Sequence, residues 1–346
     1  MQPKVNDEPS RRRSNSADFR PRAASESTLE VGRGISGRLG HRGTTVRWGF
    51  IQTPRSDDDR TPRKPPLAQL ISASKGGAMR TRLYLALLWT MGGGDERHMV
   101  NWPARTFAEL LDLKDPHRLG ERRVREAFRL FERLELLTIN AQPGRPSILR
   151  LQREDGSGET YTNPGDESRS VDWIFERLPP EHYFVELPST FWTQGWHVAL
   201  DGPALAMLLV LLRITNNGMK KGEFVSPRQR ARYRLSDDTW SRGVSQLQAY
   251  GIVTVKKKPV GEVWDFKRLR NTFTVERERL DRSPLTDEEE SPARAKARPR
   301  SRPKPKAKRA TRPTTRDTNP TPDASAKARE VYKRLAAASA RRRTPR

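Results

Sequence analysis

The stretch that decides the fold covers residues 118–139, RLGERRVREAFRLFERLELLTI. Its apolar side chains recur at spacings of three and four residues, which places them on one face of an α-helix and predicts that this face is buried. Five arginines fall on the opposite side of the same helix. The apolar set is Val124, Ala127, Phe128, Phe131 and Leu134, and the basic set is Arg118, Arg122, Arg125, Arg129 and Arg133. A basic face is as typical of a solvated helix as of one that contacts a polyanion, so the surrounding sequence must decide between the two.

The residues around this helix predict a module over residues 76–152. Downstream, residues 136–139 and 148–151 have the composition of two short strands, with turn-forming residues between them. Upstream, the almost wholly apolar segment 79–89 predicts a core helix, and Pro103 begins a second, shorter helix. The predicted order is therefore helix, short strand, helix, turn, helix and two-stranded hairpin.

The same order returns in a second module, within residues 181–280. The stretch VREAFRLFERLELLTI from Val124 aligns without a gap on WSRGVSQLQAYGIVTV from Trp240, an offset of 116 residues. Small residues match small ones and apolar residues match apolar ones, as with Ala127 and Gly243. Because the offset has the size of a domain and not of a solenoid repeat, it predicts two copies of one fold.

The segment from Leu235 to Val255 resembles the helix-turn-helix and first wing strand of winged-helix DNA-binding proteins. The stretch from Val124 to Ile139 resembles the same pattern less closely, because Glu135 stands where the family usually has glycine. The residues that carry the resemblance are Leu235, Ser236, Thr239, Trp240, Arg242, Gly243, Val244, Leu247, Gly251, Ile252 and Val253. The resemblance implies a mainly α fold with small antiparallel β wings, of the α+β class, in two tandem winged-helix domains. A tandem pair is similar in architecture to plasmid replication initiators and to tandem winged-helix transcription regulators.

Most of the excess positive charge lies at the two ends of the chain. The formal net charge is +25, from 67 basic and 42 acidic residues. Residues 1–75 and 281–346 are rich in charged, Ser and Pro residues, which predicts disordered basic tails. Residues 153–180 are the predicted linker between the two domains. Two segments of the tails are candidates for contact with a second copy or another protein: 44–51, which is strand-like in composition or else an unstructured apolar stretch, and 324–340, which is predicted to form a short helix.

The composition favours a polyanionic partner, with double-stranded DNA ahead of a membrane surface. The chain contains no run of about 20 apolar residues, the length needed to span a membrane, and it does not open on a signal peptide. We therefore expect a cytoplasmic protein associated with the bacterial nucleoid or a plasmid. Cysteine is absent and the five histidines are not paired at metal-ligand spacing, so no metal and no cofactor is expected. The chain has no P-loop, and His182 beside Tyr183 lacks the second histidine and the carboxylates of a nicking enzyme. We therefore expect a protein that is not an enzyme.

Side chains near the start of a helix that enters the major groove reach base edges, whereas more distal cations contact phosphates. In the first domain the expected base contacts are Arg118, Arg122 and Arg125, the expected backbone contacts are Arg129 and Arg133, and Arg145 on the hairpin turn is expected at the minor groove. In the second domain the expected helix contacts are Ser241, Arg242 and Ser245, and the expected phosphate contacts are Arg228, Arg230, Arg232, Arg234, Lys256, Lys257, Lys258, Lys267 and Arg268. The alternative for this second hairpin is an exposed edge whose charges prevent aggregation.

These observations predict a sequence-specific double-stranded DNA-binding protein with two winged-helix domains, acting as a replication initiator of the plasmid type or as a transcription regulator. The alternative is a non-specific organiser of DNA, similar to nucleoid proteins or linker histones, in which the basic tails provide the binding.

Overall fold

The computed structural model describes residues 21–53, 64–72, 76–93, 98–166, 183–260 and 268–285. All of these belong to one compact unit, Met1–Ala297. The predicted C-terminal helix at 324–340 lies outside the described residues, as does nearly all of the predicted C-terminal tail.

Residues 77–151 form module A. Its antiparallel sheet has the strand order β2-β4-β3, so the short first strand pairs with the second strand of the hairpin. The elements are α4 (Gly77–Gly92), β2 (Met99–Val100), α5 (Ala104–Leu110), the π-helical turn η1 (Pro116–Gly120), α6 (Glu121–Arg133), β3 (Leu137–Asn140) and β4 (Ile148–Leu151).

Module B, residues 202–275, has the same topology, because its antiparallel sheet has the order β6-β8-β7. The elements are α10 (Gly202–Ile214), β6 (Glu223–Phe224), α11 (Pro227–Ala231), α12 (Asp237–Ala249), β7 (Val253–Val260) and β8 (Arg268–Val275). The predicted class, helices with small antiparallel sheets, and the predicted order of elements are confirmed in both modules.

The repeat extends to the backbone hydrogen bonds where the third helix of each module ends. The N–H of Leu136 donates to the carbonyl five residues earlier at 3.0 Å, and the N–H of Ile252 does the same at 2.9 Å. The residue before each of them is left-handed, with φ of 58° at Glu135 and 70° at Gly251. This conformation costs a residue other than glycine about 1 kcal/mol. Module A nevertheless has the same helix exit as module B, with glutamate in place of glycine.

The described N-terminal segment, residues 21–53 and 64–72, contradicts the prediction of a disordered tail over residues 1–75. It forms α1 (Glu26–Arg38), β1 (Thr44–Arg47), α2 (Trp48–Ile51) and α3 (Pro66–Ser72). Strand β1 pairs with β5 (Phe184–Leu187), so the segment 44–51 is part of the chain's own fold. The local composition predicted disorder because the residues that bury this segment lie far away in the sequence.

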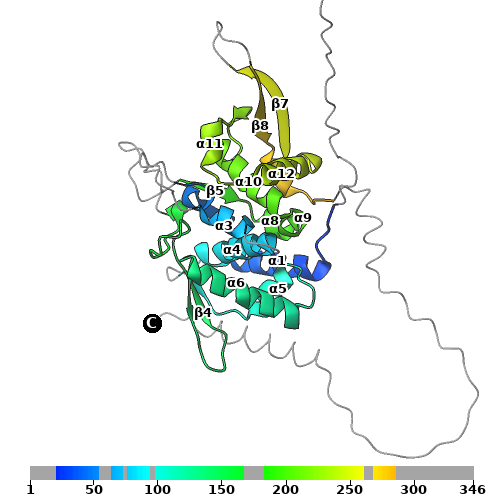
Figure 1. Cartoon of the computed structure of the whole chain (residues 1–346). Helices are drawn as coiled ribbons and strands as arrows, with labels where there is room; N and C mark the ends of the chain where they lie inside the picture. Colours follow the sequence, from blue (N-terminus) through cyan, green and yellow to red (C-terminus); the bar gives the residue numbers. More distant parts are fainter. Residues whose placement is uncertain are drawn as a thin grey trace, which may run out of the picture. The chain divides into compact units, whose positions relative to one another are not determined.

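One apolar core serves both modules. Helices α4 and α10 are almost wholly buried and contact each other, and Figure 1 shows the hairpins β3–β4 and β7–β8 on opposite sides of them. Helix α12 lies so close to α10 that a Cβ at Gly243 would be 2.3 Å from the carbonyl oxygen of Pro203. The two modules are thus joined by packing as well as by the chain between them.

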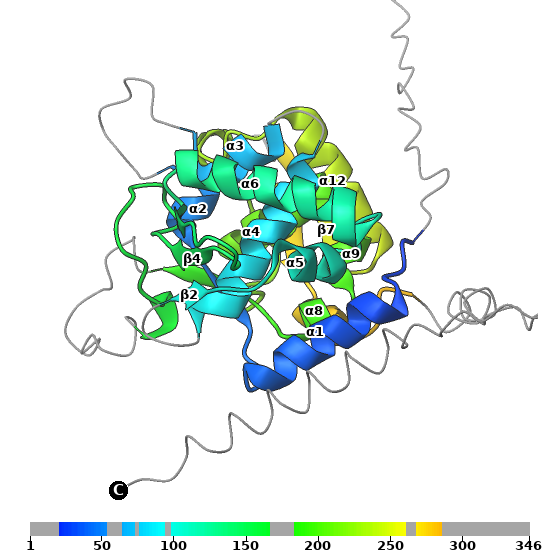
Figure 2. The same cartoon turned by 90° about the horizontal axis from the view of Figure 1, so that it is seen from below.

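The N-terminal segment contacts both modules. Figure 2 shows α1 running beside α8 (Thr190–Thr193) and α5, and the hydroxyl of Thr28 donates to the carbonyl of Glu109 at 2.8 Å. The indole of Trp192 donates to Thr44 at 2.9 Å and stacks on Trp89, with ring centroids 4.8 Å apart. Two further short helices, α9 (Trp196–Ala199) and η3 (Arg277–Asp281), complete this part of the chain.

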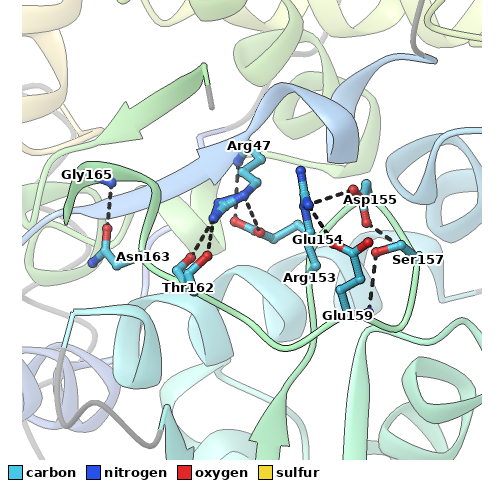
Figure 3. A network of polar contacts seen from close by, with 9 residues as sticks. All are labelled: Arg47, Arg153, Glu154, Asp155, Ser157, Glu159, Thr162, Asn163 and Gly165. Carbon is cyan, nitrogen blue, oxygen red and sulfur yellow. Dashed lines mark hydrogen bonds and ion pairs between the residues drawn. The ribbon is translucent and has the colours of Figure 1, made fainter. Parts of the chain in front are cut away.

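A buried polar network attaches β1 to residues 153–166 of the predicted linker (Figure 3). The Arg47 guanidinium donates through Nη2 to the carbonyl and hydroxyl of Thr162 at 2.7 and 2.8 Å, and its Nε lies 3.6 Å from Oε2 of Glu154. The side chains of Arg47 and Glu154 are 1% and 0% exposed. Burial raises the pKa of Glu154 to about 7, against the opposing effect of the Arg47 charge. This part of the predicted linker is therefore packed into the fold.

Candidate nucleic-acid interface

Helix α6 presents its basic face to solvent as the sequence predicts. Val124, Ala127, Phe128 and Phe131 are buried, whereas the arginines Arg118, Arg122, Arg125, Arg129 and Arg133 are all exposed. The face follows directly from the helical period, because the apolar side must cover the core and the opposite side then points outward.

Two of these arginines are paired within the helix. Nε of Arg122 lies 2.9 Å from Oε1 of Glu126, and Nη2 of Arg125 lies 2.6 Å from Oε1 of Glu121. Exposed pairs four residues apart contribute only a few tenths of a kcal/mol, so a phosphate or a guanine can replace the carboxylate at small cost.

A groove of about 750 Å³ lies between α6 and the β3–β4 hairpin. Trp102 and Phe128 contribute apolar surface to it, and Arg125, Arg129 and Arg145 contribute cations. The hairpin turn places Arg145 there: its N–H donates to the carbonyl of Gln142 at 3.2 Å. The structure thereby brings together three arginines that the sequence assigned separately to helix and hairpin.

Leu119 is a residue of this surface that the sequence reasoning missed. It lies in η1, immediately before α6, and is 58% exposed beside Arg118. The available signal was that Leu119 is a large apolar residue outside the spacing of the buried face. A leucine among arginines at the start of such a helix is suited to contact a thymine methyl group.

Helix α12 of module B differs from α6 in charge. Its first turn carries Asp237 and Asp238, and its N-terminus is capped by Ser236, whose hydroxyl accepts from the N–H of Thr239. Arg242 is exposed but lies 3.4 Å from Asp238 and 3.9 Å from Asp201. Ser241 and Ser245 are exposed as predicted. The surface of α12 is therefore polar, with its one arginine close to two carboxylates.

The arginines of and after α11 have separate roles. Arg228 and Arg234 are exposed, whereas Arg230 stacks on Trp240 at 4.7 Å and pairs with Asp237 at 2.6 Å. Arg232 donates through Nε and Nη2 to the carbonyl of Thr53, at 3.2 and 2.9 Å. Arg232 therefore holds the N-terminal segment on module B, a use that the sequence did not indicate.

The β7–β8 hairpin carries a run of three exposed lysines. Lys256, Lys257 and Lys258 follow one another along β7 and are all exposed. No carboxylate occurs in either strand, and no ion pair joins these lysines to the described part of the chain. Arg270 of β8 lies over the ring of Phe224 at 4.5 Å. Of the remaining predicted contacts, Arg268 begins β8, and Lys267 lies outside the described residues.

His197 is a second buried group whose pKa is shifted toward the neutral form. Its Nε2 lies 2.8 Å from the carbonyl oxygen of Leu110 and its Nδ1 lies 3.4 Å from that of Phe191. Burial lowers the pKa of His197 to about 4, so the imidazole is neutral near pH 7. Its two carbonyl neighbours belong to α5 and α8, so His197 joins module A to the short helices that precede module B.

In the described part of the chain, no group of three or more His, Asp or Glu side chains is arranged to hold a metal ion. Among the same residues, no helix has both the length and the apolar character needed to cross a bilayer. Comparison of the chain with protein-family models, with curated proteins and with solved structures gives no match.

Proposed function

We propose that the chain is a sequence-specific double-stranded DNA-binding protein with two winged-helix domains, modules A and B, and that it acts as a replication initiator or a transcription regulator. The observation that carries the proposal is a pair of modules with the same strand order and the same helix exit. In module A, five exposed arginines follow one another along η1 and α6.

The geometry of module A supports DNA binding through α6 and the β3–β4 hairpin. A helix with cations near its start fits the major groove, and bidentate contact of arginine with guanine contributes about 1–3 kcal/mol of discrimination. Arg118, Arg122 and Arg125 are the proposed base contacts, and Arg129 and Arg145 are the proposed contacts with phosphates or with the minor groove beside them. Residues 118–133 contain six arginines, the five named above and Arg123, against three glutamates. This surface therefore stays cationic even with its internal ion pairs.

Module B supports binding in a different way. The exposed lysines of β7 are proposed phosphate contacts, with Arg228 and Arg234 beside α11. Helix α12 contributes hydroxyl groups, and its single arginine must leave Asp238 and Asp201 before it can contact DNA. Module A is therefore the proposed source of most sequence specificity.

The test is selection of bound duplexes from a random pool by the full chain, followed by measurement of the affinity for the selected sequence. Loss of one bidentate arginine contact lowers affinity about 5- to 150-fold, so Arg118→Ala and Arg122→Ala should each fall in that range on the selected site. Arg38→Ala, which removes an exposed arginine from α1, is the matched control and should bind as the wild type does.

Two results contradict the proposal. If no sequence is enriched and random DNA competes fully, the protein is a non-specific organiser, and truncation after residue 285 should then remove most of the binding. If a site is enriched but both α6 variants bind it like the wild type, α6 is not the recognition helix. The position of the selected site, in repeats at an origin or at a promoter, distinguishes replication from transcription.

A further inference from the structure

Strands β7 and β8 carry two exposed apolar side chains, Pro259 and Leu269, that the proposed phosphate contacts do not use. These strands have eight residues each, whereas β3 and β4 have four. Figure 1 shows the two strands extending beyond α11 and α12. Leu269, near the end of the described part of the hairpin, is 67% exposed.

The pairing of the strands shows which face carries this leucine. Side chains of directly paired residues lie on the same face, and successive pairs alternate between faces. Val253 pairs with Val275 and Val255 with Phe273, and this face packs on the core. The next pair on the same face is Lys257 with Asn271, followed by Pro259 with Leu269, and all four are exposed. The core-facing side of the sheet thus continues beyond the core as an exposed overhang, formed first by the polar pair Lys257 and Asn271 and then by the apolar pair Pro259 and Leu269.

Charge identifies the kind of partner that this overhang fits. Neither strand contains an acidic residue, and Lys256, Lys257 and Lys258 are exposed along β7. Because β7 is the edge of its sheet, a second copy could add a strand there only by bringing lysines against lysines, and Pro259 offers no N–H for such pairing. A polyanion is complementary to the exposed lysines of β7.

The apolar pair further favours the stacked faces of the bases over their edges. In the minor groove the base edges carry donors and acceptors but no methyl group, and Leu269 and Pro259 cannot satisfy them, whereas the faces exposed when a base step opens are apolar. Proteins that bend DNA insert apolar side chains into such steps from the minor groove, with cations on the flanking phosphates.

We infer that the β7–β8 hairpin is a DNA-bending arm, in which Leu269, supported by Pro259, enters a base step from the minor groove while Lys257 and its neighbours hold the flanking phosphates. The inference rests on the proposed duplex binding and adds an architectural role to it. Module A selects the sequence, and module B deforms the duplex next to it.

The experiment measures binding and bending separately on the selected duplex. Affinity is determined first; the bend is then measured at saturating protein by energy transfer between dyes at the two duplex ends, and opened steps by permanganate reactivity of thymines. The variant is Leu269→Thr, which keeps a strand-forming residue. The matched control is Met219→Thr, since Met219 is 71% exposed but lies outside the hairpin.

Wild type and Met219→Thr should bend the duplex and expose one reactive step. Leu269→Thr should lose at least half of the energy-transfer change and the reactive step, with affinity within about threefold of the wild type. If the wild-type complex binds but is straight, or if Leu269→Thr bends the duplex like the wild type, the bending arm is refuted while the proposed function stands. If Leu269→Thr instead changes the sedimentation of the protein without DNA, Leu269 belongs to a protein interface and the inference is wrong. Absence of any selected site refutes the proposed function itself.

Discussion

Glu154 and His197 should impose opposite pH dependences on the stability of the fold. Folding raises the pKa of Glu154 from its ordinary value of 4.5 to about 7, so between these pH values the folded chain binds a proton that the unfolded chain has released. The free energy of unfolding therefore falls as the pH rises through this window. Folding lowers the pKa of His197 from 6.5 to about 4, so between these values only the unfolded chain is protonated there, and the free energy of unfolding falls as the pH decreases.

The two contributions are similar in size, since each pKa change corresponds to about 3 kcal/mol over its full window. In the wild type they oppose each other between pH 4.5 and 6.5, so we expect a nearly flat profile there. Glu154→Gln removes one of them, and its free energy of unfolding should fall by about 3 kcal/mol from pH 6.5 to pH 4. His197→Gln removes the other and should show the opposite slope from pH 4.5 to pH 7.

The assay is urea unfolding at a series of pH values, monitored by tryptophan fluorescence and analysed by linear extrapolation. Slopes are compared with that of the wild type, so a constant loss of stability in either variant does not affect the result. Glu126→Gln, a change on the exposed face of α6, is the control and should keep the flat profile. Parallel profiles for wild type and Glu154→Gln would mean that Arg47 keeps Glu154 ionised throughout and that the reasoning from burial is wrong.

Three further predictions concern binding to the selected duplex. Replacing Lys256, Lys257 and Lys258 together by Gln should lower the magnitude of the slope of log affinity against log salt by about 2.7, so that between 50 and 200 mM salt the variant loses about 40-fold less affinity than the wild type. Arg33→Gln with Arg38→Gln on α1 is the control, and a change in slope below about 1 would exclude these lysines as phosphate contacts. Glu126→Gln releases Arg122 from its ion pair at 2.9 Å and should tighten binding about 2- to 5-fold in a mobility-shift titration, whereas weaker binding would contradict the proposed position of Arg122. Leu119→Ser should lower the preference for thymine at one position of the selected site about fourfold, as expected for one lost methyl contact, and an unchanged selection profile would remove Leu119 from the interface.

Local periodicity was sufficient to predict α6 and its neighbours. The buried and exposed faces of α6 follow from a spacing of 3.6 residues per turn, and the hairpins follow from short apolar runs on either side of turn residues. The repeat at 116 residues aligns Glu135 of module A with Gly251 of module B, but the sequence alone did not predict that Glu135 adopts the same left-handed helix exit.

The N-terminal segment could not be predicted in this way. Its strand β1 is completed by β5, whose residues lie about 140 positions later, and Arg47 is balanced by Glu154 and Thr162. Each of these contacts depends on two residues that no local pattern connects. The same reason explains Arg232, which looked like one more phosphate contact in a basic helix and in fact binds the carbonyl of Thr53.

This segment also determines how the two proposed DNA contacts can act together. Helix α1 contacts α5 of module A as well as α8, and Arg232 of module B binds the carbonyl of Thr53, two residues after α2. With α4 and α10 in one core, the arginines of α6 and the lysines of β7 belong to a single packed body. Two contact surfaces held in this way require their base pairs at one fixed spacing, and the energy of deforming the duplex to meet both then adds to sequence selectivity. That requirement favours an initiator or regulator with a defined site over an organiser, whose basic segments must bind DNA at any position.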